Sequence, residues 1–426
     1  MSTPQVMQHT HGGRTAASAG AKRLLAFTMA IFIAATAVGL AALWPHGAPA
    51  KEPWLYEGAS LVTGTVVEAV PGDPTPGQDE PGDEGEGAGG GYLRVLLDSG
   101  ETVEVPEDPS APVTETRVGQ RVKIMTIDTG TGTEEDIGAY TFMDYERGVP
   151  LLILALVFVA AVVAVARWKG VAALAGLVVA LSLVWTFTLP ALRMGKNPLL
   201  VALVTAAAVM LVVVYLAHGI SVKTTTALLG TFAGIAAMTA LAYWAIPATS
   251  LTPLQDEVMG QLPYVFPGID ARGILLCAMV LAGVGVLNDV TVTQASSVWE
   301  LRAAVPQAPR RTVFAHAMRI GRDHIASIVY TIAFAYVGTA LAMLLLASRL
   351  DFTIIELLTF NTIAQEIVAT LVAAISLIAA IPITTALASW LAGSLPLHVP
   401  TTTQQRGPDT QAGYPQRVGS DEGGVA

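Results

Sequence analysis

Charged residues and cysteines are scarce in this sequence. Only 13% of its 426 residues are charged and 53% are apolar, whereas soluble domains average roughly 25% charged and 45–50% apolar residues. This balance argues against an ordinary soluble fold and predicts an integral membrane protein. The single cysteine, Cys277, stands in an apolar run, where we expect an inert buried thiol rather than redox chemistry or metal binding.

Motifs of common catalytic and cofactor sites are also missing. The sequence has no Cys/His metal spacing, no phosphate-binding P-loop, no Gly-x-Ser-x-Gly elbow and no His-Glu-x-x-His zinc motif. We therefore expect no enzymatic activity, no cofactor and no metal. A nucleic-acid partner is not expected either.

Acidic charge is concentrated in one segment. Ala41 to Gly148 holds 21 Asp and Glu against 6 Lys and Arg, whereas the rest of the chain has 12 against 17. Residues 45–147 predict an acidic extracytoplasmic domain of short strands, a small barrel or sandwich, with Asp98-Ser99-Gly100 as a hairpin turn. The insert at 71–91, rich in Gly, Pro, Asp and Glu, is expected to be mobile. The predicted strands are Leu61 to Val70, Tyr92 to Leu97, Glu101 to Val105 and Gln120 to Ile127.

Eight apolar runs predict an α-helical membrane bundle of about eight transmembrane helices. After a cytoplasmic tail at 1–23, the run at 24–44 is favoured as an uncleaved anchor, although Ala48-Pro49-Ala50 loosely fits a signal cleavage site. Residues 148–391 form a seven-helix membrane domain, and 392–426 a disordered cytoplasmic tail. The seven runs are Val149 to Ala166, Val171 to Leu189, Pro198 to Ala217, Thr224 to Ile246, Gly273 to Thr293, Ile325 to Ala347 and Glu366 to Leu391.

The sixth run carries the strongest functional signal. Its uninterrupted apolar part, Gly273 to Leu287, has 15 residues and rises only about 22 Å against a hydrocarbon core of about 30 Å, so polar residues must help it to cross. A carboxylate at mid-membrane costs about 2.5–3.5 kcal/mol and normally faces a cavity or a partner. We therefore expect this helix at the bundle centre, with Asp289 at the inner edge of the hydrocarbon region and shielded from lipid. The alternative is that Asp289 only caps a helix and Glu300 lies in water.

Several polar side chains accompany Asp289. Read as one helix, Asp289, Thr293, Ser296, Ser297 and Glu300 share a face. Beyond them, the basic stretch at 310–320 is expected to lie along anionic headgroups before the seventh span. The candidate ion- or solute-binding residues are Asn288, Asp289, Thr293, Ser296, Ser297, Glu300 and Asp323.

The region from Asp144 to Trp390 resembles the YibE/F-like family of bacterial multi-pass membrane proteins. The most distinctive blocks are Leu287 to Glu300 and Gly321-Arg322-Asp323. One departure is Tyr330-Thr331, where relatives typically read Asn-Thr, which puts in doubt any polar role of that position here. Further blocks are Asp144-Tyr145-Glu146-Arg147, Arg167-Trp168-Lys169-Gly170, Gly195-Lys196-Asn197-Pro198, His218-Gly219 with Lys223, and Ala227-Leu228-Leu229-Gly230-Thr231.

The resemblance implies the bundle and a β-rich outer segment, but no substrate. A transporter or channel for an ion or small solute is favoured, because an intramembrane acid beside hydroxyls is typical of a transport path. A scaffold or sensor, whose outer domain binds a partner, is the main alternative, and a membrane-embedded enzyme is a third. The expected partners are the lipid bilayer and a small solute or ion, while a homo-oligomer or a protein partner stays open.

Basic residues predict the orientation in the cell membrane. With both termini cytoplasmic, the inner segments hold 11 Lys and Arg and the short outer loops hold 4, as the positive-inside rule requires. In a Cys277→Ala background, Ser99→Cys should react with an impermeant thiol reagent in intact cells. Gln307→Cys should react only after permeabilisation. Labelling of both from outside would contradict this topology.

Overall fold

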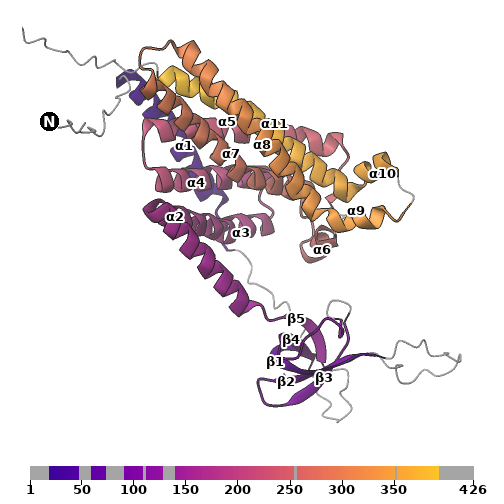
Figure 1. Cartoon of the computed structure of the whole chain (residues 1–426). Helices are drawn as coiled ribbons and strands as arrows, with labels where there is room; N and C mark the ends of the chain where they lie inside the picture. The colour runs from indigo at the N-terminus through magenta and orange to yellow at the C-terminus, as the bar shows by residue number, and fades with distance from the viewer. Residues whose placement is uncertain are drawn as a thin grey trace, which may run out of the picture.

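The computed structural model describes residues 19–47, 59–72, 91–108, 112–127, 140–253, 257–350 and 353–392. These residues form a helical bundle and a small β domain joined by one long helix (Figure 1). Most of the predicted N-terminal tail, of the insert at 71–91 and of the C-terminal tail lies outside the described residues.

The β domain is one antiparallel sheet of five strands. The strands are β1 (Ala59–Val70), β2 (Tyr92–Leu97), β3 (Thr102–Pro106), β4 (Arg121–Ile127) and β5 (Tyr140–Tyr145). In space their order is β3-β2-β1-β4-β5, so β1 is central. Because β3 also contacts β5, the sheet curls into a half barrel. The four predicted strands correspond to β1 to β4, whereas β5 was missed because it leads directly into the polar residues before the next helix.

Alternating apolar residues form the core of this domain. Val66, Val95, Val105 and Ile124 are among its fully buried side chains, since every second residue of a strand points to the same face. The predicted turn between β2 and β3 is present, with Gly100 at φ 94° and its N–H donating to the Leu97 carbonyl. A left-handed conformation of this kind favours glycine.

Arg121 of β4 links the turn after β2 to the residues just before α2. Arg121 donates from both terminal nitrogens to Asp98 at 3.0 and 2.8 Å, and from Nε to Glu146. Thr63 also donates to Asp98. The guanidinium and this hydroxyl lower the pKa of Asp98 to about 2, so the pair stays charged at ordinary pH.

The helices account for most of the remaining described chain. They are α1 (Ala19–Leu43), α2 (Gly148–Leu183), the π-helix η1 (Val184–Thr188), α3 (Leu189–Arg193), α4 (Pro198–His218), α5 (Val222–Ala248), α6 (Glu257–Val265), α7 (Ala271–Ala304), α8 (Arg310–Thr339), α9 (Leu341–Ala347), α10 (Ile354–Thr359) and α11 (Asn361–Ala392). Side chains cap the starts of three bundle helices. Asn197, Ser221 and Asp270 accept backbone N–H groups in the first turns of α4, α5 and α7, which satisfies donors that have no partner inside the helix.

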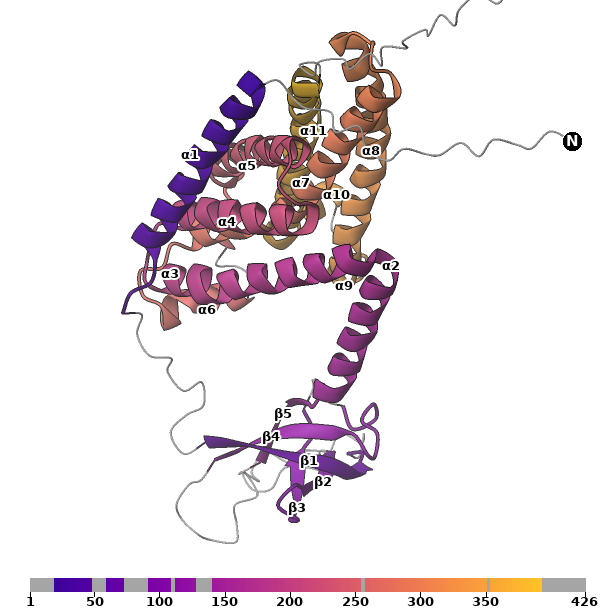
Figure 2. The same ribbon diagram turned by 90° about the vertical axis from the view of Figure 1, so that its left-hand side faces the viewer.

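The helix α2 bends sharply at Arg167 (Figure 2). Arg167 has φ 53° and ψ −132°, outside the helical region. Gly170 then lies so close to the preceding limb that an added Cβ would be 2.7 Å from the Val162 carbonyl oxygen. The predicted span 149–166 is therefore the first limb of α2, and the predicted span 171–189 covers the second limb together with η1 and Leu189. A sharp bend joins the two limbs.

The helix α7 lies at the centre of the bundle, as predicted. It contacts α4, α5, α8 and α11. Glycines allow the closest approaches: a Cβ on Gly234 would be 2.7 Å from Leu287, and one on Gly283 would be 2.1 Å from Met238. Small residues of this kind let neighbouring backbones pack closely. The first helix, α1, packs on α4 and α5, with Phe32 stacked on Phe232 at 4.5 Å between ring centroids, and its retention in the mature chain stays a prediction.

The segment before the seventh predicted span is not a separate surface helix. α8 runs without interruption from Arg310 to Thr339, because Val313 and Ala317 are buried against α7 and α11. The prediction of a headgroup-associated stretch at 310–320, distinct from a span that begins at 325, was therefore wrong about the helix boundary.

Within the described residues, six helical segments are long and apolar enough to cross a membrane, or seven if α8 and α9, bent by 63°, form one segment. Both limbs of α2 fall in one 46-residue segment, Gly148–Arg193, of about 69 Å, more than twice the hydrocarbon thickness of about 30 Å. If each limb crosses separately, the count is eight. The apolar helices suggest a membrane protein, and the number eight stays a prediction.

The contact between α5 and α11 supplies a stability test. A Cβ on Gly230 would lie 2.1 Å from the Thr384 hydroxyl oxygen and 2.9 Å from its Cβ, whereas a Cβ on Gly285 would have no atom within 4 Å. We expect Gly230→Ala to destabilise the chain by about 1–3 kcal/mol through overpacking. Gly285→Ala, the matched control, should be neutral or stabilising by up to about 1 kcal/mol. Equilibrium unfolding in detergent measures both, and equal effects would contradict the packing.

Candidate functional site

The predicted site residues of α7 fall on its outward side. Asp289 and Glu300 are exposed, while Thr293, Ser296 and Ser297 are half-buried. The face that they share is opposite the contacts with α5 and α11, and the expectation that Asp289 is shielded from lipid stays a prediction. Asp323 of α8 is also exposed. Among the predicted residues that the structure describes, Asn288 has a buried side-chain oxygen, Oδ1, without a hydrogen-bond partner.

A different set of polar side chains is buried on the opposite face of α7. Thr291 hydrogen bonds to Thr231 of α5 at 2.6 Å. One turn further, Gln294 donates from Nε2 to the Thr385 hydroxyl of α11 at 2.7 Å and to the Ala317 carbonyl of α8 at 2.9 Å. We call these five residues the inner polar layer. It links four helices by hydrogen bonds in apolar surroundings, where an unpaired polar group is costly.

Close backbone contacts surround the inner polar layer. Gly230 of α5 meets Thr384 of α11, and a Cβ on Gly321 of α8 would be 3.2 Å from Gln294 Nε2. A larger residue at either position would separate the helices and lengthen the hydrogen bonds. The motif Gly321-Arg322-Asp323 therefore contributes its glycine to the layer, while Arg322 and Asp323 are exposed.

Several buried oxygens near this layer have no hydrogen-bond partner among the described residues. They are Asn288 Oδ1, Thr384 Oγ1 and Ser389 Oγ. Thr384 lies one residue before Thr385 of the inner polar layer, and Asn288 lies three residues before Thr291. Because a buried oxygen without a partner costs free energy, such atoms mark places where water, an ion or a polar solute would be stabilised.

The depth of the site follows from the antiparallel contact of α5 and α7. Thr231 contacts Thr291, and Gly234 contacts Leu287, so Asp289 is level with residues between Thr231 and Gly234. These lie near the middle of α5, a helix of 27 residues or about 40 Å. The helix α7, at 34 residues, extends beyond the start of α5, and the position of Asp289 at the inner edge of the hydrocarbon region stays a prediction.

The neighbouring helix α8 brings a histidine to the same level. Gln294 approaches Gly321, and Gly283 lines a common cavity with Ile332, so Asp289 is level with the turn of α8 that contains His324. His324 is half-buried. Glu300 lies eleven residues beyond Asp289, about 16 Å along the axis, and its neighbour Trp299 packs at the level of α1 and the start of α5.

No cluster in the described part of the chain has the composition of a metal centre. Among those residues, no group of three or more His, Cys, Asp or Glu side chains is placed to hold an ion. The inner polar layer consists instead of neutral hydroxyl, amide and carbonyl groups. Such groups can hydrogen bond a polar solute or replace part of the hydration shell of an ion.

The family comparison agrees with these helices. A family model described as YibE/F-like protein matches residues 154–394, which include the inner polar layer and all the predicted site residues. The chain belongs to the YibE/F-like family. The resemblance identified from Leu287 to Glu300 and from Gly321-Arg322-Asp323 is confirmed. Comparison with curated proteins and with solved structures found no match.

Sequence reasoning missed the buried half of this YibE/F-like site. The residues Asn288, Thr291 and Gln294 recur every three positions, a spacing that also keeps side chains near one face of a helix. This spacing indicates a second polar face, but the charge of Asp289 favoured the face of Asp289, Thr293 and Ser296 as the candidate site. Thr231, Thr384 and Thr385 carried no separate signal, since threonines are common in apolar helices.

Removal of a partner in the inner polar layer should weaken the bundle. Gln294→Ala leaves the Thr385 hydroxyl and the Ala317 carbonyl without their donor, so we expect a loss of about 1–3 kcal/mol in the free energy of unfolding. Ser296→Ala, on the outward side of the same helix, should change it by less than about 0.5 kcal/mol. Unfolding in mixed micelles followed by circular dichroism measures both. If Gln294→Ala is as stable as Ser296→Ala, the inner polar layer does not stabilise the bundle.

Proposed function

We propose that this YibE/F-like protein is a multi-pass cell-membrane protein that moves an ion or a small solute. In this proposal the apolar helices cross the membrane, both termini are cytoplasmic, and the β domain lies outside. The basic asymmetry of the loops supports that orientation. The path follows the inner half of α7.

One observation carries the proposal: Asn288 and Asp289 are adjacent in sequence but have opposite surroundings. The Asn288 oxygen Oδ1 is buried without a partner, while the Asp289 side chain is exposed, both level with the middle of α5. A carboxylate at that depth is costly in lipid and favours water or a polar partner. We infer that water reaches Asp289 along the outward face of α7.

The remaining polar residues fit roles along this path. Glu300 is the cytoplasmic mouth, and Thr293, Ser296 and Ser297 supply hydroxyls between the mouth and Asp289. A carboxylate with neutral oxygens suits a proton or a hard cation better than a soft transition metal. Asp323 and His324 of α8 are the charged and titratable groups nearest in level on the neighbouring helix.

A scaffold or sensor is the second candidate, and the connection of the β domain supports it. Only Glu146 and Arg147 separate β5 from α2. The Glu146 N–H donates to the Arg121 carbonyl at 2.8 Å, and its carboxylate pairs with the Arg121 guanidinium. A partner bound to the β domain would therefore reorient the first limb of α2 directly.

The two candidates predict opposite effects of the Asp289 charge. In proteoliposomes that carry Na⁺, K⁺ or proton gradients, we expect Asp289→Asn to reduce flux at least about tenfold, since charge-assisted contacts are worth about 1.5–3 kcal/mol. Glu300→Gln, in a hydrated position, should reduce flux less than about fivefold. Protein incorporation is matched by immunoblot.

Wild-type flux in Asp289→Asn would exclude this site from transport. If none of the gradients produces flux above empty liposomes, while changes in the β domain abolish a cellular phenotype that Asp289→Asn retains, the scaffold function replaces the transporter.

A further inference from the structure

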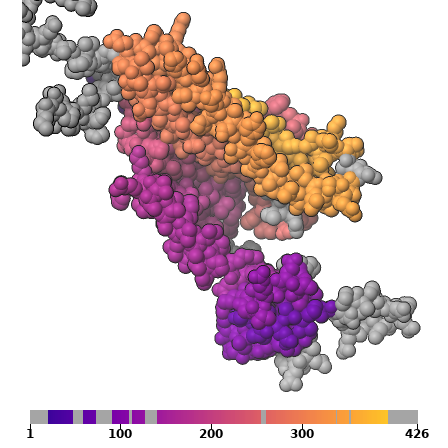
Figure 3. All heavy atoms as spheres, in the orientation of Figure 1, coloured from indigo at the N-terminus to yellow at the C-terminus, as the bar shows by residue number. Residues whose placement is uncertain are grey.

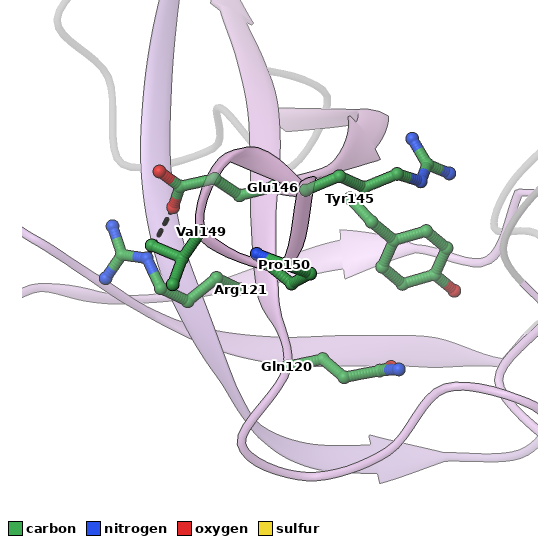
Figure 4. Close-up of a pocket in the computed structure, with 7 residues that line it drawn as sticks. Gln120, Arg121, Tyr145, Glu146, Val149 and Pro150 are labelled. Atoms are coloured by element: carbon green, nitrogen blue, oxygen red, sulfur yellow. Dashed lines mark hydrogen bonds and ion pairs between the residues drawn. The ribbon is translucent and has the colours of Figure 1, made fainter. Parts of the chain in front are cut away.

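A cavity of about 520 Å³ lies where the β domain meets α2 (Figure 4). The Arg121–Glu146 ion pair lies on one side of Val149 and Pro150, and Tyr145 lies on the other. Gln120 and Arg147 complete the lining. The volume is within the range of about 300–1,000 Å³ that is typical of small-ligand sites.

Basic residues gather at this end of an otherwise acidic domain. Only six Lys and Arg occur between Ala41 and Gly148, and four of them stand just before β4, in its first residues or just after β5: Arg117, Arg121, Lys123 and Arg147. Within the cavity the lining carries two guanidiniums and one carboxylate. Arg121 is paired with Asp98 and Glu146, whereas Arg147 is paired with Asp144 through Nη1, so Arg147 is the cation of the lining with donors left for an anionic group.

Arg147 retains hydrogen-bond donors for such a group. Its Nη1 pairs with Asp144, and its guanidinium lies over the Tyr145 ring at 5.6 Å from the centroid. A guanidinium has five N–H donors in a planar fork that suits phosphate oxygens. More than half of the Arg147 side-chain surface is exposed, so a ligand can reach it.

An apolar surface continues directly from the cavity. Val149 lines the cavity and is 68% exposed, and Leu151, Leu152 and Leu154 beyond it are each at least 59% exposed. None of the 18 residues in the most apolar window of this segment is buried. In Figure 3 this limb forms a column between the β domain and the bundle. A polar, cationic cavity at the end of a bare apolar helix is complementary to a molecule with a phosphate at one end and hydrocarbon at the other.

We propose that this cavity binds the phosphate-bearing headgroup of a phospholipid, with its acyl chains along the first limb of α2. Arg147 contacts the phosphate, and Gln120, whose Oε1 accepts the Arg117 N–H, donates from Nε2 to the polar part of the headgroup. The lipid belongs to the leaflet on the side of the β domain. This inference rests on the membrane insertion proposed above but not on transport.

Native mass spectrometry of the full chain in detergent tests the proposal. The probes are short-chain phosphatidylglycerol, a diacylglycerol of the same chain length without phosphate, and inorganic phosphate. We expect phosphatidylglycerol to bind most tightly. Arg147→Gln should weaken it at least about tenfold, and Arg147→Lys less, because lysine keeps the charge but not the fork.

Arg94→Gln is the matched control. Arg94, with 37% of its side-chain surface exposed against 54% for Arg147, pairs with Glu68 and Glu104. It does not line the cavity, so its loss should leave the affinity within about twofold. Circular dichroism checks that each variant is folded.

Three results would overturn the proposal. If diacylglycerol binds as tightly as phosphatidylglycerol, the phosphate contributes nothing and binding rests on apolar contact alone. Inorganic phosphate bound as tightly would make it a free-phosphate site. Equal weakening by Arg147→Gln and Arg94→Gln would make the effect one of overall charge. These outcomes do not depend on whether the flux assay detects transport.

Discussion

The close contact of α5 with α7 and α11 is the interaction on which the bundle depends. Gly230 and Gly234 have no side chains to hold these helices apart. Hydroxyl and amide groups of one helix can therefore reach hydrogen-bond partners on the next. Thr231 can then reach Thr291 at 2.6 Å. Hydrogen bonds between membrane helices average only about 0.6 kcal/mol, so their stabilising effect depends on the packing that brings the partners together.

The helices and strands follow largely from local patterns in the sequence, while their junctions do not. Alternating valines and isoleucines predicted β1 to β4, and long apolar runs predicted the bundle helices. By contrast, the sequence left Arg167 to Gly170 between two spans without indicating the path of the chain, which bends there because Gly170 lets the limbs approach. Gly321-Arg322-Asp323 suggested a boundary, yet α8 continues because Val313, Ala317 and Gly321 pack on its neighbours. Tertiary contact outweighs local propensity at both places.

Half of the candidate site was accessible to sequence reasoning. The polarity of the part of α7 that follows an apolar stretch of 15 residues, too short to cross alone, pointed to the helix that also carries the buried Thr291 and Gln294. Both faces of that region are polar, however. Which face is buried depends on where α5 and α11 pack. The three-residue spacing of Asn288, Thr291 and Gln294 marks a polar face but does not show that this face is the buried one. The charge of Asp289 favoured one face, whereas neutral Thr291 and Gln294 bond within the bundle.

The central claim is that water reaches Asp289 at the depth of the middle of α5. Single cysteines placed along α7 in a Cys277→Ala background, in sealed inside-out vesicles, test it directly. An impermeant thiol reagent should modify Asp289→Cys and Thr293→Cys, and it should leave Leu287→Cys and Ala295→Cys, on the buried face, unmodified. If Asp289→Cys reacts only with a lipid-soluble reagent, the outward face of α7 is in lipid and the proposed path does not exist.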